Sequence, residues 1–167
     1  MKTLSGLTAA RLREILSYDP GTGNFIRKVR TSNSTRAGDI AGSATQLGYW
    51  IIWVDGTRYL GHRLAWLYTH GRWPKDHIDH VNGDPSDNRL CNLREATPSQ
   101  NHANERMART NKAGRKGVAP HRNKFVAQLG IGGHRKYLGI YATPDEAAEA
   151  YASAAKAHFG EFARTEG

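Results

Sequence analysis

The chain has 167 residues, 38% of them hydrophobic, and a formal net charge of +9 at pH 7, so we expect small hydrophobic cores. Cys91 is the sole cysteine, which excludes a disulfide within the chain and favours a reducing, intracellular setting. No apolar run approaches the ~18 residues of a membrane span, and charged residues interrupt the N-terminus where a signal peptide is apolar.

The first sixty residues predict a short helix followed by hairpins. Residues 8–17 place apolar side chains on one helical face, with Thr8 as the N-cap. Residues 49–54 and 58–60 have strand composition, and the Asp-Gly pair in the sequence between them predicts a tight hairpin turn.

The middle of the chain predicts two helices on either side of an irregular segment. Residues 62–69 form the first, ended by Gly71. Residues 74–97 are dense in Asp, Asn, Pro and His and show little periodicity. Thr97 then begins the second helix, with Gln100 at the capping-box position.

The C-terminal part predicts a small sheet covered by one helix. Residues 109–116 have the composition of a flexible basic linker, and 124–129 and 136–141 that of strands. Thr143 caps a long, alanine-rich helix that ends at Gly160. We expect a three-stranded sheet with this helix packed closely against it.

Positive charge is concentrated in one stretch. Nine Lys or Arg residues and no Asp or Glu lie between Arg106 and Lys136. Such a segment favours a polyanion, because each neutralised phosphate releases condensed counterions. An anionic membrane, an acidic protein or a merely solvated linker is the alternative.

Residues 75–105 contain the side chains best suited to catalysis. Asp79 and His80 are adjacent, Asn92 follows His80 by twelve residues, and Asn101 lies in the helix that Thr97 caps. Two strands and a helix would bring the four together. An imidazole can accept a proton from water near neutral pH, and carboxylate and amide oxygens suit Mg²⁺ or Mn²⁺. These residue types fit hydrolysis of a phosphodiester.

A set of short motifs with this spacing resembles the phage and homing HNH endonucleases. The motifs are His62-Arg63-Leu64-Ala65-Trp66, Ile78-Asp79-His80-Val81-Asn82-Gly83, Asp87-Asn88-Arg89, Asn92-Leu93-Arg94 and Asn101. The resemblance implies a ββα-metal fold in which His80 is the general base, Asn92 orients it, and Asp79 and Asn101 bind one divalent metal ion per chain, Mg²⁺ or Mn²⁺. Asn101 stands where many members have His, and the neighbouring His102 leaves the last ligand open.

Each assignment has a simpler alternative. Asp76-His77 repeats the Asp-His pair three residues earlier, but only Asp79-His80 adjoins the Asn-Gly turn and has the family spacing to Asn92. Asn92, taken alone, could only cap a loop, as could Asn88 in the same stretch.

His62 is expected to be a packed, hydrogen-bonded structural histidine rather than a catalytic one.

Residues 117–163 resemble the ethylene-response-factor (Apetala-type) DNA-binding domain. The motifs are Lys116-Gly117-Val118, 124–129, 137–141, 143–151 and Gly160-Glu161-Phe162-Ala163. The resemblance implies that the sheet lies in the major groove with the helix behind it. The residues implied to face DNA are His121, Arg122, Lys124, Gln128, Arg135 and Tyr137. Several base-reading arginines of plant members are absent, so the plant sequence preference does not carry over. A small oligomerisation domain is the alternative.

We therefore predict an α+β protein with four segments. Residues 1–61 form a helix-and-hairpin scaffold, 62–108 an HNH nuclease module, 109–116 a basic linker and 117–165 the DNA-binding domain. The predicted function is metal-dependent, site-preferring cleavage of double-stranded DNA, without a membrane or an obligate protein partner. The family suggests a phage-encoded, homing-type enzyme in a bacterial cytoplasm. The alternatives are a non-catalytic DNA-binding regulator and a basic protein that coats DNA.

Overall fold

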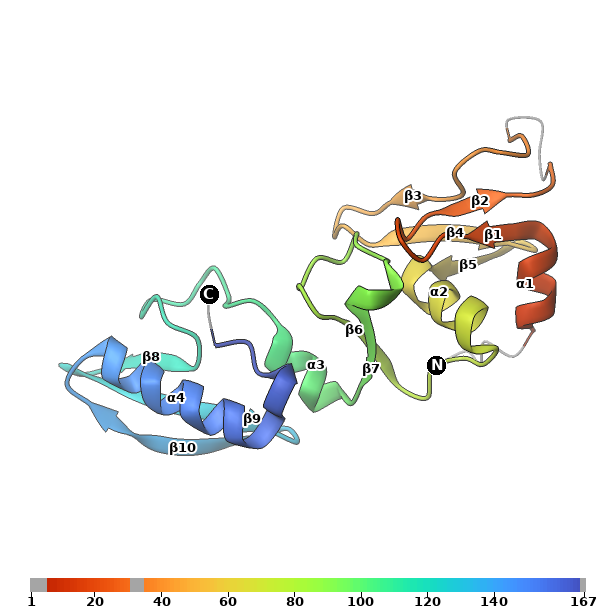
Figure 1. Cartoon of the computed structure of the whole chain (residues 1–167). Helices are drawn as coiled ribbons and strands as arrows, with labels where there is room; N and C mark the ends of the chain where they lie inside the picture. Colours follow the sequence, from red (N-terminus) through yellow and green to blue (C-terminus); the bar gives the residue numbers. More distant parts are fainter. Residues whose placement is uncertain (1–5, 31–34, 166–167) are drawn as a thin grey trace. The chain divides into compact units, whose positions relative to one another are not determined.

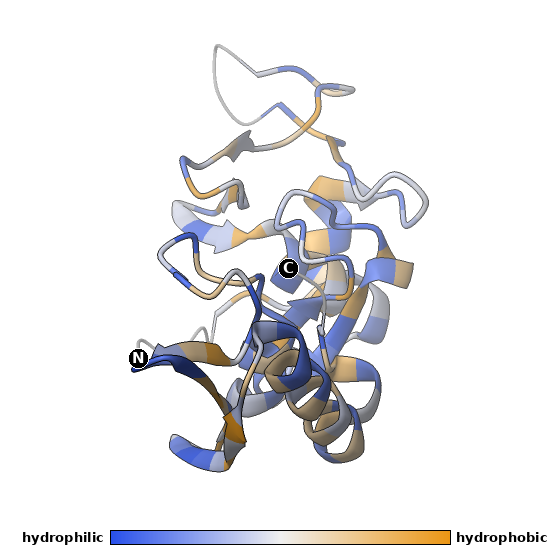
Figure 2. Ribbon diagram, turned by 90° about the vertical axis from the view of Figure 1, so that its left-hand side faces the viewer, coloured by the Kyte–Doolittle hydropathy of each residue, from blue (hydrophilic) through white to orange (hydrophobic). Residues whose placement is uncertain are grey.

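The structure is a computed structural model that describes residues 6–30 and 35–165. It divides into two compact units, the first ending at Glu95 and the second beginning at Ala96, and each is described by itself (Figure 1). Hydrophobic and hydrophilic residues alternate along the helices and strands (Figure 2). Within the described ranges, no helix has the length and apolar character needed to cross a membrane.

The first unit begins with a helix that passes directly into a strand. Helix α1 (Ala9–Ile15) starts at Thr8, whose hydroxyl accepts a hydrogen bond from the backbone N–H of Arg11, as its sequence predicts. The end of the predicted helix is instead strand β1 (Leu16–Tyr18), which pairs antiparallel with β2 (Phe25–Arg27). Pairing with the next strand of the chain overrides the local helical pattern here.

A three-stranded antiparallel sheet and a helix complete the scaffold. The sheet has the order β3 (Ser43–Ala44), β4 (Trp50–Val54), β5 (Thr57–Leu60). The predicted hairpin between β4 and β5 is confirmed, and Asp55 and Gly56 both have positive φ, 47° and 74°. Helix α2 (Gly61–His70) ends at Gly71 with φ 71°, also as predicted.

The core of the first unit joins the scaffold to the segment that follows it. Leu12, Phe25, Ile52 and Leu64 are completely or almost completely buried in one cluster, which also includes Leu93. Burying one such side chain contributes about 1.5–3 kcal/mol. The described residues before α2 and the part of the predicted nuclease module up to Glu95 therefore contribute to one core.

The catalytic segment lies on a short two-stranded sheet in this unit. Strand β6 (His77–His80) is a neighbour of β7 (Leu93–Ala96), and the 3₁₀ turn η1 (Leu90–Asn92) leads into β7. Gly83 forms the predicted turn after β6 with φ 67°, and its N–H donates to the carbonyl of His80 at 2.8 Å.

The second unit starts with a helix and contains the predicted sheet-and-helix domain. Helix α3 (Pro98–Asn104) begins with the predicted capping box of Thr97 and Gln100. The later elements are β8 (Val118–His121), β9 (Lys124–Ile131), β10 (His134–Tyr141), α4 (Pro144–Phe159) and the turn η2 (Gly160–Phe162). The strands form an antiparallel sheet in the order β10-β9-β8, with α4 packed on it. The order of the elements along the chain, β6, β7 and then α3, is that of a ββα layout. The packing of these three elements into a ββα-metal fold remains a prediction.

The helix α4 packs through small and aromatic side chains. Tyr151, Ala155 and Phe159 share a buried cluster with Leu129 of β9. Ala103 of α3 belongs to the same cluster, so α3 is part of the second unit, although the sequence placed it inside the nuclease module. The small alanine side chains allow α4 to approach the sheet closely.

The segment 109–116 is held in place, whereas the sequence predicted a flexible linker. The ammonium group of Lys116 donates to the carbonyls of Ala103 and Glu105 at 2.6 and 2.5 Å, near the C-terminal end of α3. Burial lowers the pKa of Lys116 to about 8. Arg115 donates to a carboxylate oxygen of Asp145 on α4 at 2.8 Å. These contacts are made far along the chain, and composition alone does not reveal them.

The turn at Gly23 offers a test of how the first unit is held together. Gly23 has φ 78°, and a Cβ there would lie 2.6 Å from backbone atoms of Asn88 and Arg89. We expect Gly23→Ala to lower the free energy of unfolding by about 2–4 kcal/mol. The backbone strain of alanine at positive φ and the steric overlap of its Cβ with the neighbouring backbone both contribute. Gly56 has a similar φ of 74° with nothing within 4 Å of the added Cβ, so Gly56→Ala should cost only about 1 kcal/mol. Urea unfolding of both variants measures the difference, and equal losses would contradict the close approach.

Candidate active site and DNA-binding face

The pair Asp79 and His80 lies at the end of β6 and is buried, with 4% and 7% of the residue surface exposed. Burial follows from their position in the two-stranded sheet beside the core residue Ile78. The alternative pair is different: the side chains of Asp76 and His77 are about half exposed and lie 3.9 Å apart. Only the Asp79-His80 pair is thus enclosed in the fold.

The carboxylate of Asp79 is paired with a buried arginine from the neighbouring strand. Both Nε and an Nη of Arg94 on β7 lie 2.9 Å from Asp79 Oδ2. The side chains are 5% and 15% exposed, so the two charges compensate each other in a site with little water. Arg94 belongs to the Asn92-Leu93-Arg94 motif, but the spacing of the motifs along the sequence did not predict a role for it.

The ring of His80 makes a hydrogen bond to an asparagine that the sequence did not assign to the site. Its Nε2 lies 3.4 Å from Oδ1 of Asn88, which is itself 4% exposed. An amide oxygen only accepts, so Nε2 carries the proton and the lone pair is at Nδ1. Burial lowers the pKa of His80, and Asn88 and the carboxylate of Asp79 oppose this shift. A neutral imidazole with a lone pair is the form that a general base requires.

Asn92 is placed beside the same loop but contacts its backbone. Its Oδ1 accepts from the N–H of Asn82 at 3.0 Å, and its Nδ2 donates to Asn82 Oδ1 and to the carbonyl of Asp87. Its own carbonyl accepts from the N–H of Val81, next to His80. Asn92 therefore holds the loop that follows β6. Asn92 could therefore orient the base His80, as predicted, only indirectly, by holding the backbone of this loop.

His62 is buried next to His80, at the start of α2. The two rings are perpendicular with centroids 5.0 Å apart, and the Tyr49 ring lies 5.6 Å from His62. The predicted packing is confirmed. The predicted hydrogen bonding is wrong for one ring nitrogen: among the described residues, Nδ1 of His62 is buried without a hydrogen-bond partner.

This burial predicts a loss of stability in acid. Desolvation, then the neighbouring His80 and Arg63, lower the pKa of His62 to about 3, against about 6.5 in the unfolded chain. As pH falls from about 6.5 towards 3, the unfolded chain binds a proton that the folded chain does not. Stability that is present above pH 6.5 is lost, by up to about 1.4 kcal/mol per pH unit.

The measurement is urea unfolding of the parent chain and His62→Asn between pH 7.5 and 4. The stability difference between them should shrink as pH falls, because the variant has no imidazole to protonate at this site. Carboxylates that titrate in the same range act equally on both chains. His134→Asn changes a histidine that is exposed in the second unit and is the control. A difference between the parent and His62→Asn that does not change with pH would show that His62 is not buried in its neutral form.

The fourth predicted residue, Asn101, is on α3 in the second unit. It is half-buried, and the described contacts include no hydrogen bond of its side chain. The alternative ligand His102 has its Nδ1 2.7 Å from a carboxylate oxygen of Glu105, the residue that follows α3, and its side chain is 71% exposed. The pairing of Asn101 with Asp79 remains a prediction.

The donor set fits a hard divalent cation that keeps water ligands. Over the described part of the chain, no three His, Cys, Asp or Glu side chains gather into a group that could hold a metal. A carboxylate such as that of Asp79 is a ligand that Mg²⁺ accepts.

In the second unit, five of the six residues predicted to face DNA lie on one face of the sheet. The register pairs His121 with Lys124, Gln128 with Tyr137, and Gly130 with Arg135. Alternate residues of β9 point to opposite faces of the sheet. The residues of β9 that alternate with Lys124, Gln128 and Gly130 pack under α4.

The sixth predicted residue, Arg122, is in the turn between β8 and β9 with φ 54°. Tyr137 is 59% exposed on the free face. The sheet thus has a free face with basic, amide and aromatic groups.

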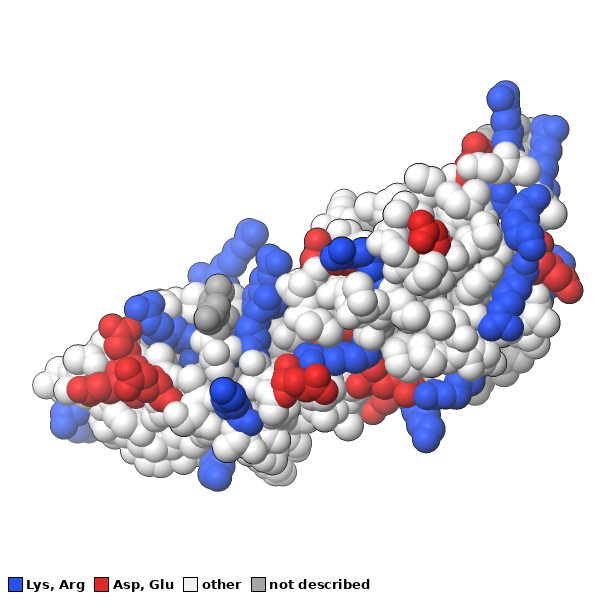
Figure 3. All heavy atoms as spheres, in the orientation of Figure 1, with Lys and Arg blue, Asp and Glu red and all other residues white. Residues whose placement is uncertain are grey.

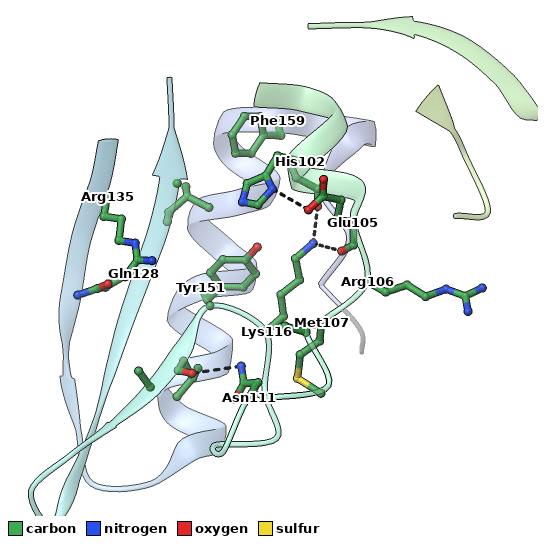
Figure 4. A pocket seen from close by; sticks show the side chains of 17 residues that line it. His102, Glu105, Arg106, Met107, Asn111, Lys116, Gln128, Arg135, Tyr151 and Phe159 are labelled. Carbon is green, nitrogen blue, oxygen red and sulfur yellow. Dashed lines mark hydrogen bonds and ion pairs between the residues drawn. The ribbon is translucent and has the colours of Figure 1, made fainter. Parts of the chain in front are cut away.

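The second unit has an acidic region and a pocket. Acidic side chains gather over the first turn of α4, where Asp145 and Glu146 lie (Figure 3). A pocket of about 370 Å³ is lined by residues that include His102, Lys116, Gln128, Arg135 and Tyr151 (Figure 4). Two of the predicted DNA-facing residues, Gln128 and Arg135, line this pocket as well.

Residues 59–103 match the family model described as HNH endonuclease. An uncharacterized HNH endonuclease of Acanthamoeba polyphaga mimivirus is 32% identical over 117 residues, which are 70% of this chain and 61% of that protein. Protein 3.8 of Escherichia phage T7 is 37% identical over 59 residues, 35% of this chain and 49% of that protein. The chain thus spans between about half and three-fifths of these relatives. No solved structure matches.

These matches support an HNH endonuclease segment and homology to viral proteins. The matched residues 59–103 include Asp79, His80, Asn92 and Asn101. The resemblance of residues 117–163 to the ethylene-response-factor domain lies beyond this segment and remains a prediction.

Proposed function

We propose that the protein is a metal-dependent DNA endonuclease in which His80 is the general base. The observation that carries the proposal is the His80 imidazole, buried beside Asp79 and bonded through Nε2 to Asn88. The family match over residues 59–103 supports the reaction class.

In this proposal His80 Nδ1 takes a proton from a water molecule, and the resulting hydroxide attacks the phosphorus of a DNA phosphodiester. The bond from phosphorus to the 3′ oxygen breaks, and the leaving oxygen receives a proton from solvent. A divalent cation held by Asp79, with Asn101 as its second protein ligand, would stabilise negative charge on the phosphate and the leaving oxygen. Arg94 fixes the carboxylate of Asp79 by a charge-assisted hydrogen bond from its Nε at 2.9 Å and by the ion pair between the two groups. Asn92 holds the backbone of the loop next to His80.

DNA targeting is assigned to the free face of the sheet β8–β10, as in the ethylene-response-factor domains that the sequence resembles. Lys124, Gln128, Arg135 and Tyr137 supply charge, amide and aromatic groups on this face. The cleaved substrate is double-stranded DNA, and one His80 per chain favours nicking by a monomer. We also propose a phage-encoded, homing-type role in a bacterial cytoplasm, which is implied by the resemblance of residues 62–101 to phage and homing HNH endonucleases.

A plasmid-nicking assay tests the proposal. Supercoiled DNA should become nicked with the full chain and Mg²⁺ or Mn²⁺, and should stay intact when EDTA is added. Binding without cleavage over a series of divalent cations would favour the non-catalytic regulator instead.

A further inference from the structure

We propose that Asn88, held by Tyr18 of the N-terminal hairpin, is the residue that positions the His80 ring. This inference rests on the proposed nuclease function and adds to it a positioning residue outside the set of Asp79, His80, Asn92 and Asn101. It also assigns the hairpin β1–β2 a part in the active site.

The first step is the contact between the two side chains. Asn88 Oδ1 lies 3.4 Å from His80 Nε2, and both residues are buried. This distance is long for an N–H···O bond, as is common for catalytic hydrogen bonds before substrate is bound. Because Oδ1 can only accept, it selects the tautomer with the proton on Nε2 and the lone pair on Nδ1.

The second step is that Asn88 is itself held from a distant part of the chain. The hydroxyl of Tyr18 donates to the Asn88 carbonyl at 2.7 Å in a buried position, across 70 residues of sequence. Burial raises the pKa of Tyr18 above 10, so the hydroxyl remains a donor in the neutral range. Tyr18 is fixed by its ring contact with Phe25, at a centroid distance of 4.8 Å.

The third step is the fit of the backbone around Asn88. Gly23, in the turn after β1, comes so close that a Cβ would lie 2.6 Å from the Asn88 backbone. The N–H of Leu90 donates to the carbonyl of Pro20 in the same turn at 3.2 Å. The amide of Asn88 is also close to α2, since a Cβ on Gly61 would lie 3.1 Å from its Nδ2. These contacts leave the Asn88 side chain little freedom to move away from His80.

Asn88 and Asn92 therefore have different tasks. Asn92 makes its hydrogen bonds to Asn82 and to the Asp87 carbonyl, so it fixes the path of the loop. Asn88 contacts the imidazole itself, so it fixes the ring and its tautomer.

Nuclear magnetic resonance of the metal-free full chain tests the contact without any need for cleavage. With ¹⁵N-labelled histidine, His80 should show a protonated Nε2 whose proton exchanges slowly with water and has a cross-relaxation signal to Asn88. Asn88→Asp retains an acceptor of the same size and should keep the slow exchange. Asn88→Leu has a similar size without an acceptor and should lose it.

Kinetics supply the second readout. Asn88→Leu should lower kcat by about tenfold to a hundredfold with KM for DNA nearly unchanged, which is part of the 10²–10⁴-fold that a general base supplies. Asn88→Asp should recover most of that loss. Tyr18→Phe removes only the hydroxyl and should lower kcat severalfold. Its control is Tyr59→Phe, a tyrosine of equal burial in the same core, which should retain parental kcat.

The outcomes separate this inference from the function on which it rests. A His80 Nε2 that is unprotonated in the parent chain, or equally protected in Asn88→Leu, would overturn the positioning role even if the chain cuts DNA. The same conclusion follows if Tyr18→Phe and Tyr59→Phe have the same kcat. A parent chain that never cuts DNA would overturn the nuclease function, and the resonance signal would then decide the contact alone. If Asn88→Leu fails to fold, Tyr18→Phe and Asn88→Asp carry the test.

Discussion

His80→Ala is expected to abolish DNA cleavage and to leave DNA binding almost intact. The variant removes the imidazole that takes the proton from the attacking water, a contribution of about 10²–10⁴ in rate. His80 is not assigned as a metal ligand, so metal binding should survive. It is also buried, so it adds little to a DNA-contacting surface. The measurement is the nicking rate of supercoiled DNA against metal concentration, beside the affinity for uncut DNA.

Two neighbouring variants serve as comparisons. Asp79→Ala should lose rate and metal affinity together, and excess Mn²⁺ should restore part of the activity. It also leaves Arg94 buried without its carboxylate partner, so its stability must be measured alongside.

His77→Ala changes an exposed residue of the alternative pair and should stay within a small factor of the parent chain. If His77→Ala is inactive while His80→Ala cuts, the assignment is displaced by three residues. If all three variants cut normally, the nuclease assignment fails.

Local signals in the sequence predicted most of the elements. Thr8, Thr97 and Thr143 cap their helices, and Asp55-Gly56 forms the hairpin turn. Such signals depend on a few neighbouring residues and need no knowledge of the rest of the fold. The family spacing likewise selected the buried Asp79-His80 pair over the exposed Asp76-His77 pair.

Features that depend on distant contacts could not be predicted in this way. Pairing outside the helix had a similar effect at shorter range, since strand β1 replaces the end of a helical pattern by pairing with β2, the next strand of the same hairpin. Asn88 looked like an ordinary loop asparagine, and only the approach of Tyr18 across 70 residues shows how it is held. The unit boundary lies between Glu95 and Ala96 because Ala103 packs with residues far along the chain.

The second large effect is expected on DNA binding. Replacing Arg122, Lys124 and Arg135 together by alanine should weaken binding at low salt by roughly a hundredfold. Removing one phosphate interaction flattens the log–log dependence of affinity on salt by about 0.9, so the slope should fall by about 1.8 when two of the three side chains contact phosphate and the third contacts a base. Lys124 and Arg135 lie on the free sheet face, and Arg122 is in the adjacent turn. Lys156→Ala removes an exposed charge from α4 and should change neither quantity.

Single alanine variants at the same three positions separate base reading from phosphate binding. At least one should relax specificity at one base position when tested against a randomised DNA pool, by about 1–3 kcal/mol for a bidentate interaction. The others should weaken binding evenly across sequences. Point variants are preferable to a truncation near Arg109, because removing β8–β10 and α4 would uncover Ala103, which packs against Leu129 and Tyr151. An even loss for all three would mean that the sheet touches only the DNA backbone. An unchanged salt slope in the triple variant would place the DNA on another surface.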